Sequence, residues 1–323
     1  MRVLITGGCG FVGRHFINKL QTKVSEIVVV DNLIDGGGGL TPNNWNFEPI
    51  ESVKFLELDC RDFFLENHGR FDLVIHLAAV VGGRLTIERN PLAVADDLAI
   101  DANFWKWAVT NKPGHIISFS SSAAYPVNLQ NESPRRLVED DIDFEETLGI
   151  PDLTYGWAKL TSEYIGRLAA RMYGLKVASY RPFSGYGPDQ SLSYPFPSIC
   201  LRAIENAGAE LFEVWGSGLQ QRDFIHIDDI VNAVLMTYQN ITDGSSINLS
   251  SGIGTSFIDL AKLACREVGY SPLVQGQSNM PEGVFSRIGD NSKLEMLGWK
   301  PSISLDEGIK ECIDYLRVTK NLN

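Results

Sequence analysis

The chain has few cysteines, and they form no recognisable pattern. The five cysteines among 323 residues are Cys9, Cys60, Cys200, Cys265 and Cys312. Their number is odd, they are scattered, and no two of them have the spacing of metal ligands. We therefore expect neither a disulfide framework nor a zinc site, and no metal centre at all.

Basic residues are also scarce. The 28 Lys and Arg residues stand against 40 Asp and Glu residues, which gives a net charge of −12. A protein this acidic is repelled by nucleic acids and by anionic membrane surfaces, so we expect neither as a general partner. A few local arginines can still build a pocket for a small anionic molecule.

Long apolar runs are missing too, and none approaches transmembrane length. A predicted strand begins at residue 2, which leaves no room for a signal peptide, so we expect a cytoplasmic protein. The composition, 44% hydrophobic and 21% charged, is typical of a globular protein. The length suits one large domain and a smaller one.

The start of the chain predicts a phosphate-binding turn. The apolar run Val3 to Ile5 suggests a buried strand, and a helical apolar pattern begins at Val12. Between them Gly7, Gly10 and Gly13 follow at a spacing of three. Glycines allow a tight turn and a close approach to a pyrophosphate, while the helix start offers free N–H groups.

A second apolar run, Ile27 to Val30, ends in Asp31. A carboxylate at this position can accept a hydrogen bond from a ribose 2′-OH and would repel a 2′-phosphate. The pattern therefore favours NAD over NADP. The alternative is a surface carboxylate that merely ends a strand.

Strand and helix patterns alternate through the first half of the chain. Strands are predicted at residues 53–58, 71–77, 116–119 and 177–180, and helices around residues 98–109 and 157–172. This alternation predicts an α/β fold with a Rossmann-type doubly wound parallel sheet covered on both faces. Residues 32–50 suggest a mobile loop over the cofactor or substrate site, and residues 127–150 an irregular surface insertion.

Prolines after residue 188 break the alternation and predict a smaller C-terminal α/β lobe. We expect residues 1–186 and 224–252 to form the dinucleotide-binding domain. Residues 187–223 and 253–323 would then form the lobe that binds the substrate.

Tyr155 and Lys159 form the most specific chemical pattern. A spacing of four places both side chains on one face of a helix. An ammonium group beside a phenol lowers the pKa of the phenol, so Tyr155 could act as a general base. The alternative is a chance pair on a helix. The run Ser120 to Ser122 follows a predicted strand and could hold a substrate oxygen, or simply cap a turn.

Together these motifs resemble the extended short-chain dehydrogenase/reductase family, and within it the nucleotide-sugar epimerases and dehydratases. The resemblance covers nearly the whole chain. The matching segments are residues 6–13, 31–32, Asp59, 76–79, 120–122, Tyr155 with Lys159, 181–183, 186–188, 221–224 and 297–301.

The resemblance implies a role for each matching residue. The implied catalytic residues are Ser121, Tyr155 and Lys159, with Ser122 as the alternative serine. The implied NAD contacts are Gly7, Gly10, Phe11, Val12, Gly13, Asp31, Asn32, Asp59, Cys60, Leu77, Ala78, Ala79, Tyr155 and Lys159. The implied substrate contacts are Gly82, Gly83, Ser122, Ser184, Arg222 and Arg287. Asp59 would contact the adenine, and the two arginines would grip the diphosphate of a nucleotide sugar.

Some segments are similar to one part of the family. Gly82-Gly83, Tyr125-Pro126 and the run 212–220 resemble GDP-fucose synthases and GDP-mannose 3,5-epimerases, which favours a GDP-linked substrate. Ala123, however, stands where dehydratases carry an acid and 3,5-epimerases a cysteine. Tyr194 aligns with the lysine that is the second acid/base of the 3,5-epimerases, and Asp97 and Ser184 replace family asparagines.

These observations predict an NAD-dependent oxidoreductase acting at C4 of a nucleotide-activated sugar, with 4-epimerisation through a 4-keto intermediate as the simplest complete cycle. The alternatives are a 4-dehydrogenase that releases the keto sugar, a 3,5-epimerase, and a non-catalytic NAD-sensing protein. The helices around residues 97–110 and 155–173 carry more apolar side chains than one buried face requires, Trp105 and Trp107 among them. The resemblance implies that they pair across a two-fold axis in a homodimer or higher oligomer.

Overall fold

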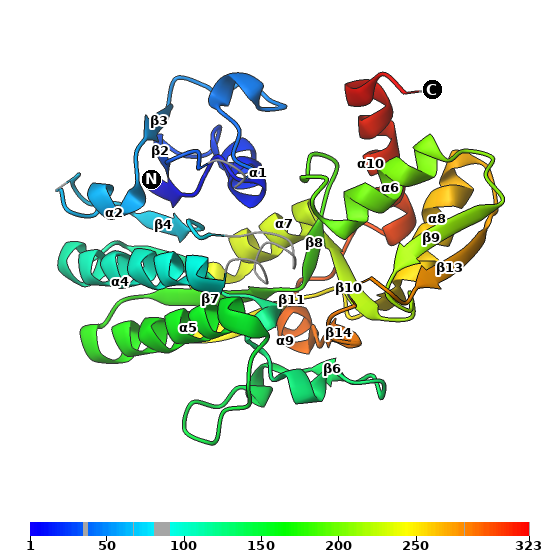
Figure 1. Cartoon of the computed structure of the whole chain (residues 1–323). Helices are drawn as coiled ribbons and strands as arrows, with labels where there is room; N and C mark the ends of the chain where they lie inside the picture. Colours follow the sequence, from blue (N-terminus) through cyan, green and yellow to red (C-terminus); the bar gives the residue numbers. More distant parts are fainter. Residues whose placement is uncertain (35–37, 67, 81–90, 281, 323) are drawn as a thin grey trace.

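A parallel sheet of seven strands organises the computed structural model, which describes residues 1–34, 38–66, 68–80, 91–280 and 282–322 (Figure 1). In spatial order the strands are β11 (Asp243–Leu249), β7 (Val177–Pro182), β5 (His115–Phe119), β4 (Leu73–His76), β1 (Arg2–Thr6), β2 (Glu26–Asp31) and β3 (Val53–Glu57). The order runs outward in both directions from β1 and β4, as in Rossmann folds. The predicted α/β class is confirmed.

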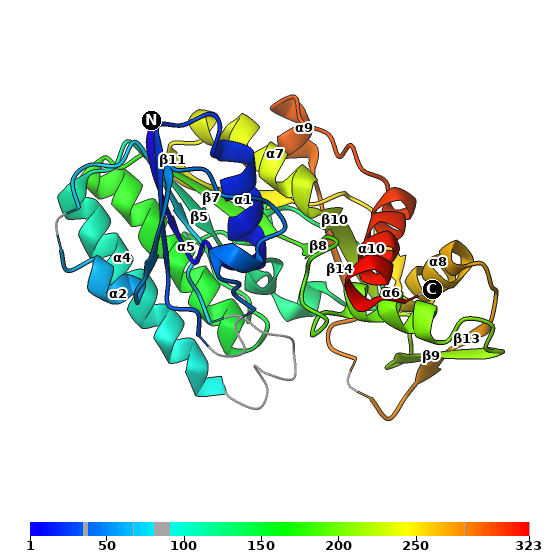
Figure 2. The same cartoon turned by 90° about the horizontal axis from the view of Figure 1, so that it is seen from above.

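The two faces of this sheet are covered by different helices. Along β1, Val3 and Ile5 pack in one core and Leu4 packs in the other, because successive side chains point to opposite faces. Helices α1 (Phe11–Leu20) and α7 (Ile227–Thr237) cover the first face. Helices α2 (Cys60–Phe63), α4 (Val94–Asn111) and α5 (Leu153–Tyr173) cover the second (Figure 2).

Besides the cores on the two faces of the large sheet, a lateral core lies to one side of that sheet (Figure 1). Side chains such as Phe196, Leu260 and Ile313 are fully or almost fully buried there. The elements around this core are α6 (Pro195–Glu205), β9 (Leu211–Trp215), α8 (Phe257–Val268), β13 (Leu273–Gln277) and α10 (Leu305–Lys320). The predicted residue boundaries between the two domains remain a prediction.

A smaller sheet connects the lateral core with the first core of the large sheet, because within one of its strands Phe224 packs in the lateral core and Ile225 in the first core. Its strands are β12 (Gly254–Ser256), β10 (Gln221–His226), β14 (Ser286–Gly289) and β6 (Arg136–Leu137), with β8 (Ser184–Tyr186) paired to β10. Helix α9 (Ser292–Met296) follows β14, and the nearby Leu294 and Trp299 pack in the first core of the large sheet. Short 3-10 turns are η1 (Pro42–Asn44), η2 (Pro91–Ala93), η3 (Ser122–Ala124), η4 (Val127–Leu129), η5 (Glu139–Asp141) and η6 (Tyr238–Asn240).

The insertion at residues 127–150 differs from its prediction as an irregular surface segment. Much of it is exposed, but β6 pairs with β14, and Gln130, Leu137 and Glu139 are buried. Polar side chains anchor it, since Glu139 Oε1 accepts a hydrogen bond of 2.9 Å from the backbone N–H of Asn248. Hydrophobic patterns in a sequence do not predict which polar side chains will be buried in this way.

The loop predicted at residues 32–50 is described except for residues 35–37. Its backbone reaches the glycine turn, where the N–H of Leu40 donates to the carbonyl of Cys9 at 3.0 Å. Trp45 is buried and its indole N–H donates to the carbonyl of Leu40 at 2.7 Å, which holds this side of the loop in place. None of the helices in the described part of the chain combines the length and the apolar character that crossing a bilayer requires.

Candidate active site

The glycine turn brings the start of α1 against the end of β4. Gly7 has a φ of +68°, and a Cβ there would lie 2.7 Å from the backbone nitrogen of Ala78. A Cβ on Gly13 would lie 2.5 Å from the Cα of Gly8. Gly10 is the N-cap of α1, so the first-turn N–H groups of Phe11, Val12 and Gly13 are oriented toward the space before the helix.

A cavity opens beside this turn, at the edge of the sheet where β1, β2 and β4 end. Nine of the predicted cofactor residues line it, namely Gly7, Gly10, Asp31, Asn32, Asp59, Cys60, Leu77, Ala78 and Ala79. Arg61, Val80, Asp96 and Ile100 also line it and were missed from the sequence. Arg61 and Val80 directly follow the predicted residues Cys60 and Ala79, so their neighbours in the sequence could have indicated them.

Carboxylates at the mouth of the cavity are held by specific donors. Asp31 accepts hydrogen bonds of 2.9 Å from the backbone N–H groups of Cys9 and Leu33. Asp59 forms an ion pair of 2.7 Å with Arg61, which lowers the pKa of Asp59. Asn32 lies beside it, with its amide nitrogen 3.4 Å from Asp59 Oδ2. Groups of the protein itself therefore fix the orientation of both acids.

The cysteines near the cavity are not nucleophiles. Cys9 and Cys60 are buried, and burial raises the pKa of each thiol to about 12. Both therefore stay protonated at neutral pH. In the described residues, no three His, Cys, Asp or Glu side chains gather where they could hold a metal ion.

Ser121, Tyr155 and Lys159 lie together at the start of α5. Lys159 Nζ is 5.6 Å from the centre of the Tyr155 ring, and the Ser121 hydroxyl hydrogen-bonds the Tyr155 phenol. Gly156 permits this arrangement, because a Cβ there would lie 2.3 Å from the carbonyl oxygen of Ala123. The start of α5 thus packs directly on the turn that carries Ser121, and the adjacent Ser122 is buried within that turn.

The pKa of Tyr155 differs from its prediction. Burial raises it, Lys159 and Ser121 lower it, and two further carboxylates, Asp97 and Asp101, raise it again. Lys159 lowers the pKa of Tyr155 as predicted, but burial and the two carboxylates outweigh it, so the pKa is raised overall. Burial acts to lower the pKa of Lys159, but the charges of Tyr155, Asp101 and Asp97 raise it, which keeps the ammonium protonated.

The two predicted substrate arginines stand next to each other. Arg222 and Arg287 are register partners on the parallel strands β10 and β14, so their side chains leave the same face. Arg287 donates to Gln130 Oε1 and to Asp152 Oδ2, both at 2.6 Å. Since Asp152 is the N-cap of α5, Arg287 lies close to the start of the helix that carries Tyr155 and Lys159.

The other predicted substrate contacts are more dispersed. Ser184 begins β8 and pairs with Phe224 of β10. Arg222 also lies over the ring of Phe257, 5.7 Å from its centre. Gly82 and Gly83 fall outside the described residues.

At the positions where relatives carry a second acid or base, this chain has Ala123 and Tyr194, and neither is a ready proton acceptor. Ala123 is buried beside Ser121 and has no group that transfers a proton. Tyr194 lies near Tyr155, and burial together with the charge of Tyr155 raises the pKa of Tyr194 to about 12. At neutral pH Tyr194 therefore carries its proton, and no cation of the described residues is among the groups that shift its pKa, whereas Lys159 favours the phenolate of Tyr155.

Comparisons with known proteins agree with this geometry. The model of the NAD dependent epimerase/dehydratase family matches residues 3–250. The chain is 28% identical to a putative UDP-glucose 4-epimerase of Methanocaldococcus jannaschii, over 98% of both chains. It is 24% identical to a GDP-L-fucose synthase of Sinorhizobium fredii, over 95% of this chain and 93% of the relative.

A solved structure has the same architecture. The UDP-glucose 4-epimerase of Thermotoga maritima, determined with UDP-glucose, is 27% identical and superposes with a TM-score of 0.81, covering 99% of this chain and 100% of that one. The family model spans most of the sequence, including the glycine turn, the serine turn and the start of α5. The chain therefore belongs to the NAD-dependent epimerase/dehydratase family of extended short-chain dehydrogenase/reductase enzymes, whose cofactor is NAD.

Proposed function

We propose that this enzyme epimerises a nucleotide-activated sugar at C4 through a 4-keto intermediate. One observation carries the proposal: Ser121, Tyr155 and Lys159 are assembled, while Ala123 occupies the place of a second acid or base. The site can therefore remove and return a hydroxyl proton, whereas the groups that relatives use to take a carbon-bound proton are replaced.

In this proposal each side chain has a defined task. Tyr155 takes the proton of the sugar O4 and returns it later, and Ser121 holds the same oxygen by a hydrogen bond. Lys159 stays protonated and orients the sugar hydroxyls of the cofactor. When bound beside the glycine turn, NAD would supply the hydride acceptor and donor for C4, and return of the hydride to the opposite face of the keto sugar would give the epimer. Arg222 and Arg287 bind the diphosphate through their guanidinium forks.

The GDP nucleotide is a finer part of the proposal. The run 212–220 and Tyr125-Pro126 resemble GDP-sugar enzymes, and a GDP-L-fucose synthase is among the relatives. The similarity to a putative UDP-glucose 4-epimerase supports the reaction at C4 and makes UDP sugars the alternative substrate. The cytoplasm remains our proposed compartment.

A homodimer formed through α4 and α5 is also part of the proposal. Leu98, Trp157, Tyr164 and Met172 on these helices are 43 to 67% exposed, which is unusual for such large apolar side chains. Trp105 and Trp107, which the sequence pattern assigned to this surplus, are instead buried in the core of the monomer. They fill the space between α4 and the sheet, so they support no contact between subunits.

The test is turnover of GDP- and UDP-hexoses in D₂O with NMR and mass spectrometry of the recovered sugar. We expect the C4 epimer, no deuterium on carbon and no need for added NAD. Accumulation of reduced nicotinamide absorbance with a keto sugar would identify a 4-dehydrogenase instead.

Two other results would contradict the proposal. Deuterium at C3, C5 or C6 would mean a 3,5-epimerase or a dehydratase with relocated groups. NAD binding without turnover of any sugar would indicate the NAD-sensing protein, although such a protein has no need for the assembled Tyr155 and Lys159.

A further inference from the structure

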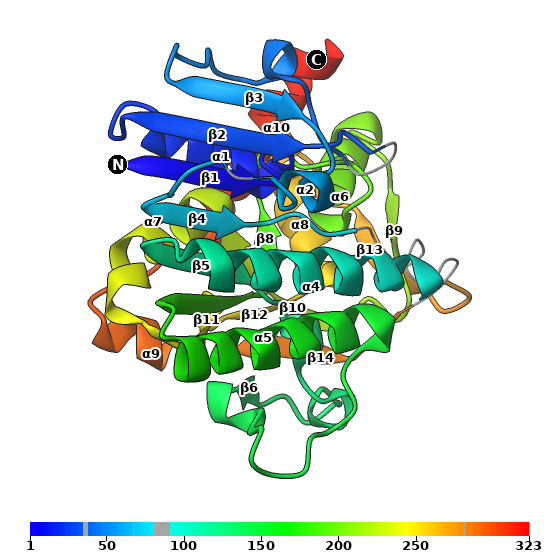
Figure 3. The ribbon, with the colours of Figure 1, turned by 90° about the vertical axis from the view of Figure 1, so that its left-hand side faces the viewer.

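Two acidic side chains face the catalytic pair from the neighbouring helix. Helices α4 and α5 lie side by side on one face of the large sheet (Figure 3). Asp97 and Asp101 are spaced by four on α4, as Tyr155 and Lys159 are on α5. Both carboxylates interact electrostatically with Lys159 and with Tyr155.

Both carboxylates are buried, and Asp97 is incompletely hydrogen-bonded. Asp97 is 1% exposed and accepts a hydrogen bond from the backbone N–H of Val80. Asp101 is 4% exposed, its Oδ1 lies 3.1 Å from His76 Nε2, and it also interacts with the Ser162 hydroxyl of α5. Within the described residues, the Oδ2 atom of Asp97 lacks a hydrogen-bond partner. Buried polar atoms normally have a partner, so this oxygen beside Lys159 requires an explanation.

We propose that Asp97 and Asp101 offset the positive charge of Lys159, and that these two carboxylates, rather than Lys159 alone, set the pH at which Tyr155 gives up its proton. Asp97 and Asp101 are positioning residues in this scheme, because they act through Lys159 and Tyr155. The biochemical consequence rests on the proposed function, but the electrostatic effect itself does not.

The charges around Tyr155 support the direction of the effect. The groups that face it are Lys159 on α5, Asp97 and Asp101 on α4, Tyr194 at the start of α6, and Ser121. His76 contacts Asp101 from β4, and burial lowers the pKa of His76, so it is neutral. Lys159 is thus the cation of this group, and its charge is opposed from α4.

Both carboxylates are ionised near neutral pH. Burial raises the pKa of Asp97 to about 6, still below 7. Burial acts to raise the pKa of Asp101, but His76 and Lys159 outweigh it and the pKa is lowered. Tyr155 therefore keeps its proton to a higher pH than it would beside Lys159 alone. Removal of a substrate proton is favoured at alkaline pH, and donation of a proton to a keto oxygen is favoured near neutrality.

The direct test is an NMR titration that requires no substrate. Protein labelled at the tyrosine Cζ carbons is titrated with saturating NAD, and the Tyr155 resonance is identified by its loss in Tyr155→Phe. In Asp97→Asn we expect Tyr155 to titrate about one pH unit or more lower, since the Asp97 charge acts on Tyr155 and a neighbouring charge typically shifts a pKa by about 1 to 3 units. Asn preserves the shape of the side chain and the acceptor for Val80.

Asp306→Asn is the matched control. Asp306 lies in the first turn of α10, its side chain is 67% exposed, and it pairs with Arg266 at 2.7 Å. Its variant loses the same charge and should leave the Tyr155 titration unchanged. The proposal is wrong if Asp97→Asn leaves Tyr155 titrating as in the wild type, or if Asp306→Asn moves it equally.

A kinetic test separates this inference from the proposed function. With an active nucleotide sugar, the rising limb of kcat/KM against pH should move to lower pH in Asp97→Asn, by the amount seen in the titration. If no nucleotide sugar is turned over, the proposed function fails while the NMR result still decides the electrostatic inference. If turnover occurs and the limb does not move, the inference fails alone.

Discussion

Helix α5 passes through two buried charged centres that differ in how completely they are bonded. At the first centre Lys159 faces Asp97 and Asp101, and Asp97 keeps an oxygen without a partner in the described part of the chain. At the second, four residues further along the helix, Glu163 pairs with Arg181 at 2.7 Å. Each centre places a buried cation against buried carboxylates, so the difference lies in the hydrogen bonds.

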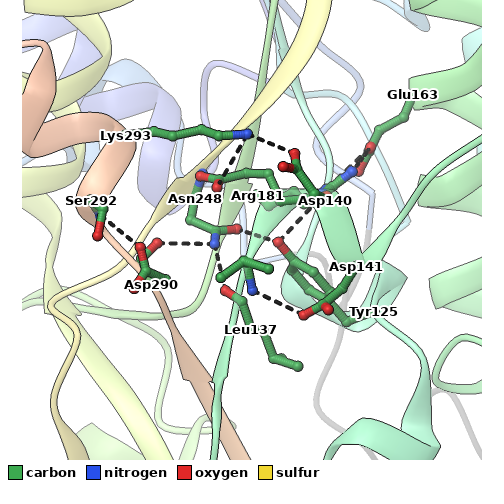
Figure 4. A network of polar contacts seen from close by, with 12 residues as sticks. Tyr125, Leu137, Asp140, Asp141, Glu163, Arg181, Asn248, Asp290, Ser292 and Lys293 are labelled. Carbon is green, nitrogen blue, oxygen red and sulfur yellow. Dashed lines mark hydrogen bonds and ion pairs between the residues drawn. The ribbon is translucent and has the colours of Figure 1, made fainter.

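The second centre is fully bonded, and Figure 4 shows the pair of Glu163 and Arg181 at its middle. Glu163 accepts from Arg181 and from the hydroxyls of Ser120 and Ser246. Arg181 also donates to Tyr125 Oη at 3.1 Å and to the carbonyl of Glu139 at 3.0 Å. Because Ser120 precedes Ser121, these bonds tie the serine turn to α5, β7 and β11.

The same network reaches the insertion at residues 127–150. Tyr125 donates to Asn248 Oδ1 at 2.7 Å, and the Asn248 amide donates to the carbonyls of Leu137 and Asp290 (Figure 4). A buried network whose members are all paired holds elements together. Unpaired buried carboxylates do the opposite, since they cost stability and retain the capacity to act on a neighbour. We therefore expect the Arg181 centre to contribute mainly to stability and the Lys159 centre mainly to the proposed reaction.

The largest effect is expected at the Lys159 centre, on activity. Tyr155→Phe removes the group that exchanges a proton while changing little volume, so turnover should fall about 10²- to 10⁴-fold. NAD affinity and the free energy of unfolding should stay close to the wild type. Turnover near the wild-type rate, measured with saturating NAD and sugar nucleotide, would show that Tyr155 is not the base.

The next effect is expected at the Arg181 centre, on stability. Arg181→Leu leaves Glu163 buried without its cation, which should lower the free energy of unfolding by about 3–5 kcal/mol. Urea denaturation measures this loss. The double variant Arg181→Leu/Glu163→Leu removes both charges and should recover part of it. If the single variant is as stable as the wild type, the network does not hold the catalytic helix.

Asp97→Asn should raise the free energy of unfolding, whereas Arg181→Leu should lower it. The pKa of Asp97 is about 6 in the folded protein and near 3.8 when unfolded, so the fold loses stability as the pH rises from 3.8 to 6 and the carboxyl ionises. The Asn variant avoids this loss and should be more stable at pH 7 by up to about 3 kcal/mol. The gain should vanish near pH 4. If the wild type and Asp97→Asn have equal free energies of unfolding at both pH 7 and pH 4, the ionised Asp97 carboxylate does not destabilise the fold.

The smallest effect is expected at the cofactor cavity, where Asp31 already accepts two backbone hydrogen bonds. Calorimetry should show NAD bound more tightly than NADP. Asp31→Asn keeps an acceptor but removes the charge, so it should improve NADP binding by about 1 kcal/mol, as expected for charges interacting across water. An unchanged ratio of the two affinities would place the 2′-position away from Asp31.

The candidate cofactor site could be predicted from short segments of the sequence. The glycine turn, the strand that ends in Asp31 and the spacing of Tyr155 and Lys159 are local patterns. The structure places the first two at the cavity by the carboxyl edge of the sheet, and it packs the start of α5 on the turn that follows β5. Other parts depended on contacts between distant segments. The anchoring of residues 127–150 through Glu139 and the pairing of Arg287 with Asp152 required the folded arrangement.

The sequence by itself determined the fold class, the family and the residues placed at the site, because hydrophobic periodicity, glycine spacing and residue identity are local properties. Only the tertiary structure decided what those residues experience. Lys159 lies one turn from Tyr155 in any helix, yet the pKa of Tyr155 is raised because burial and the carboxylates of α4 outweigh that ammonium. Desolvation and charge depend on everything packed around a group, and α4 meets α5 only after the chain has folded.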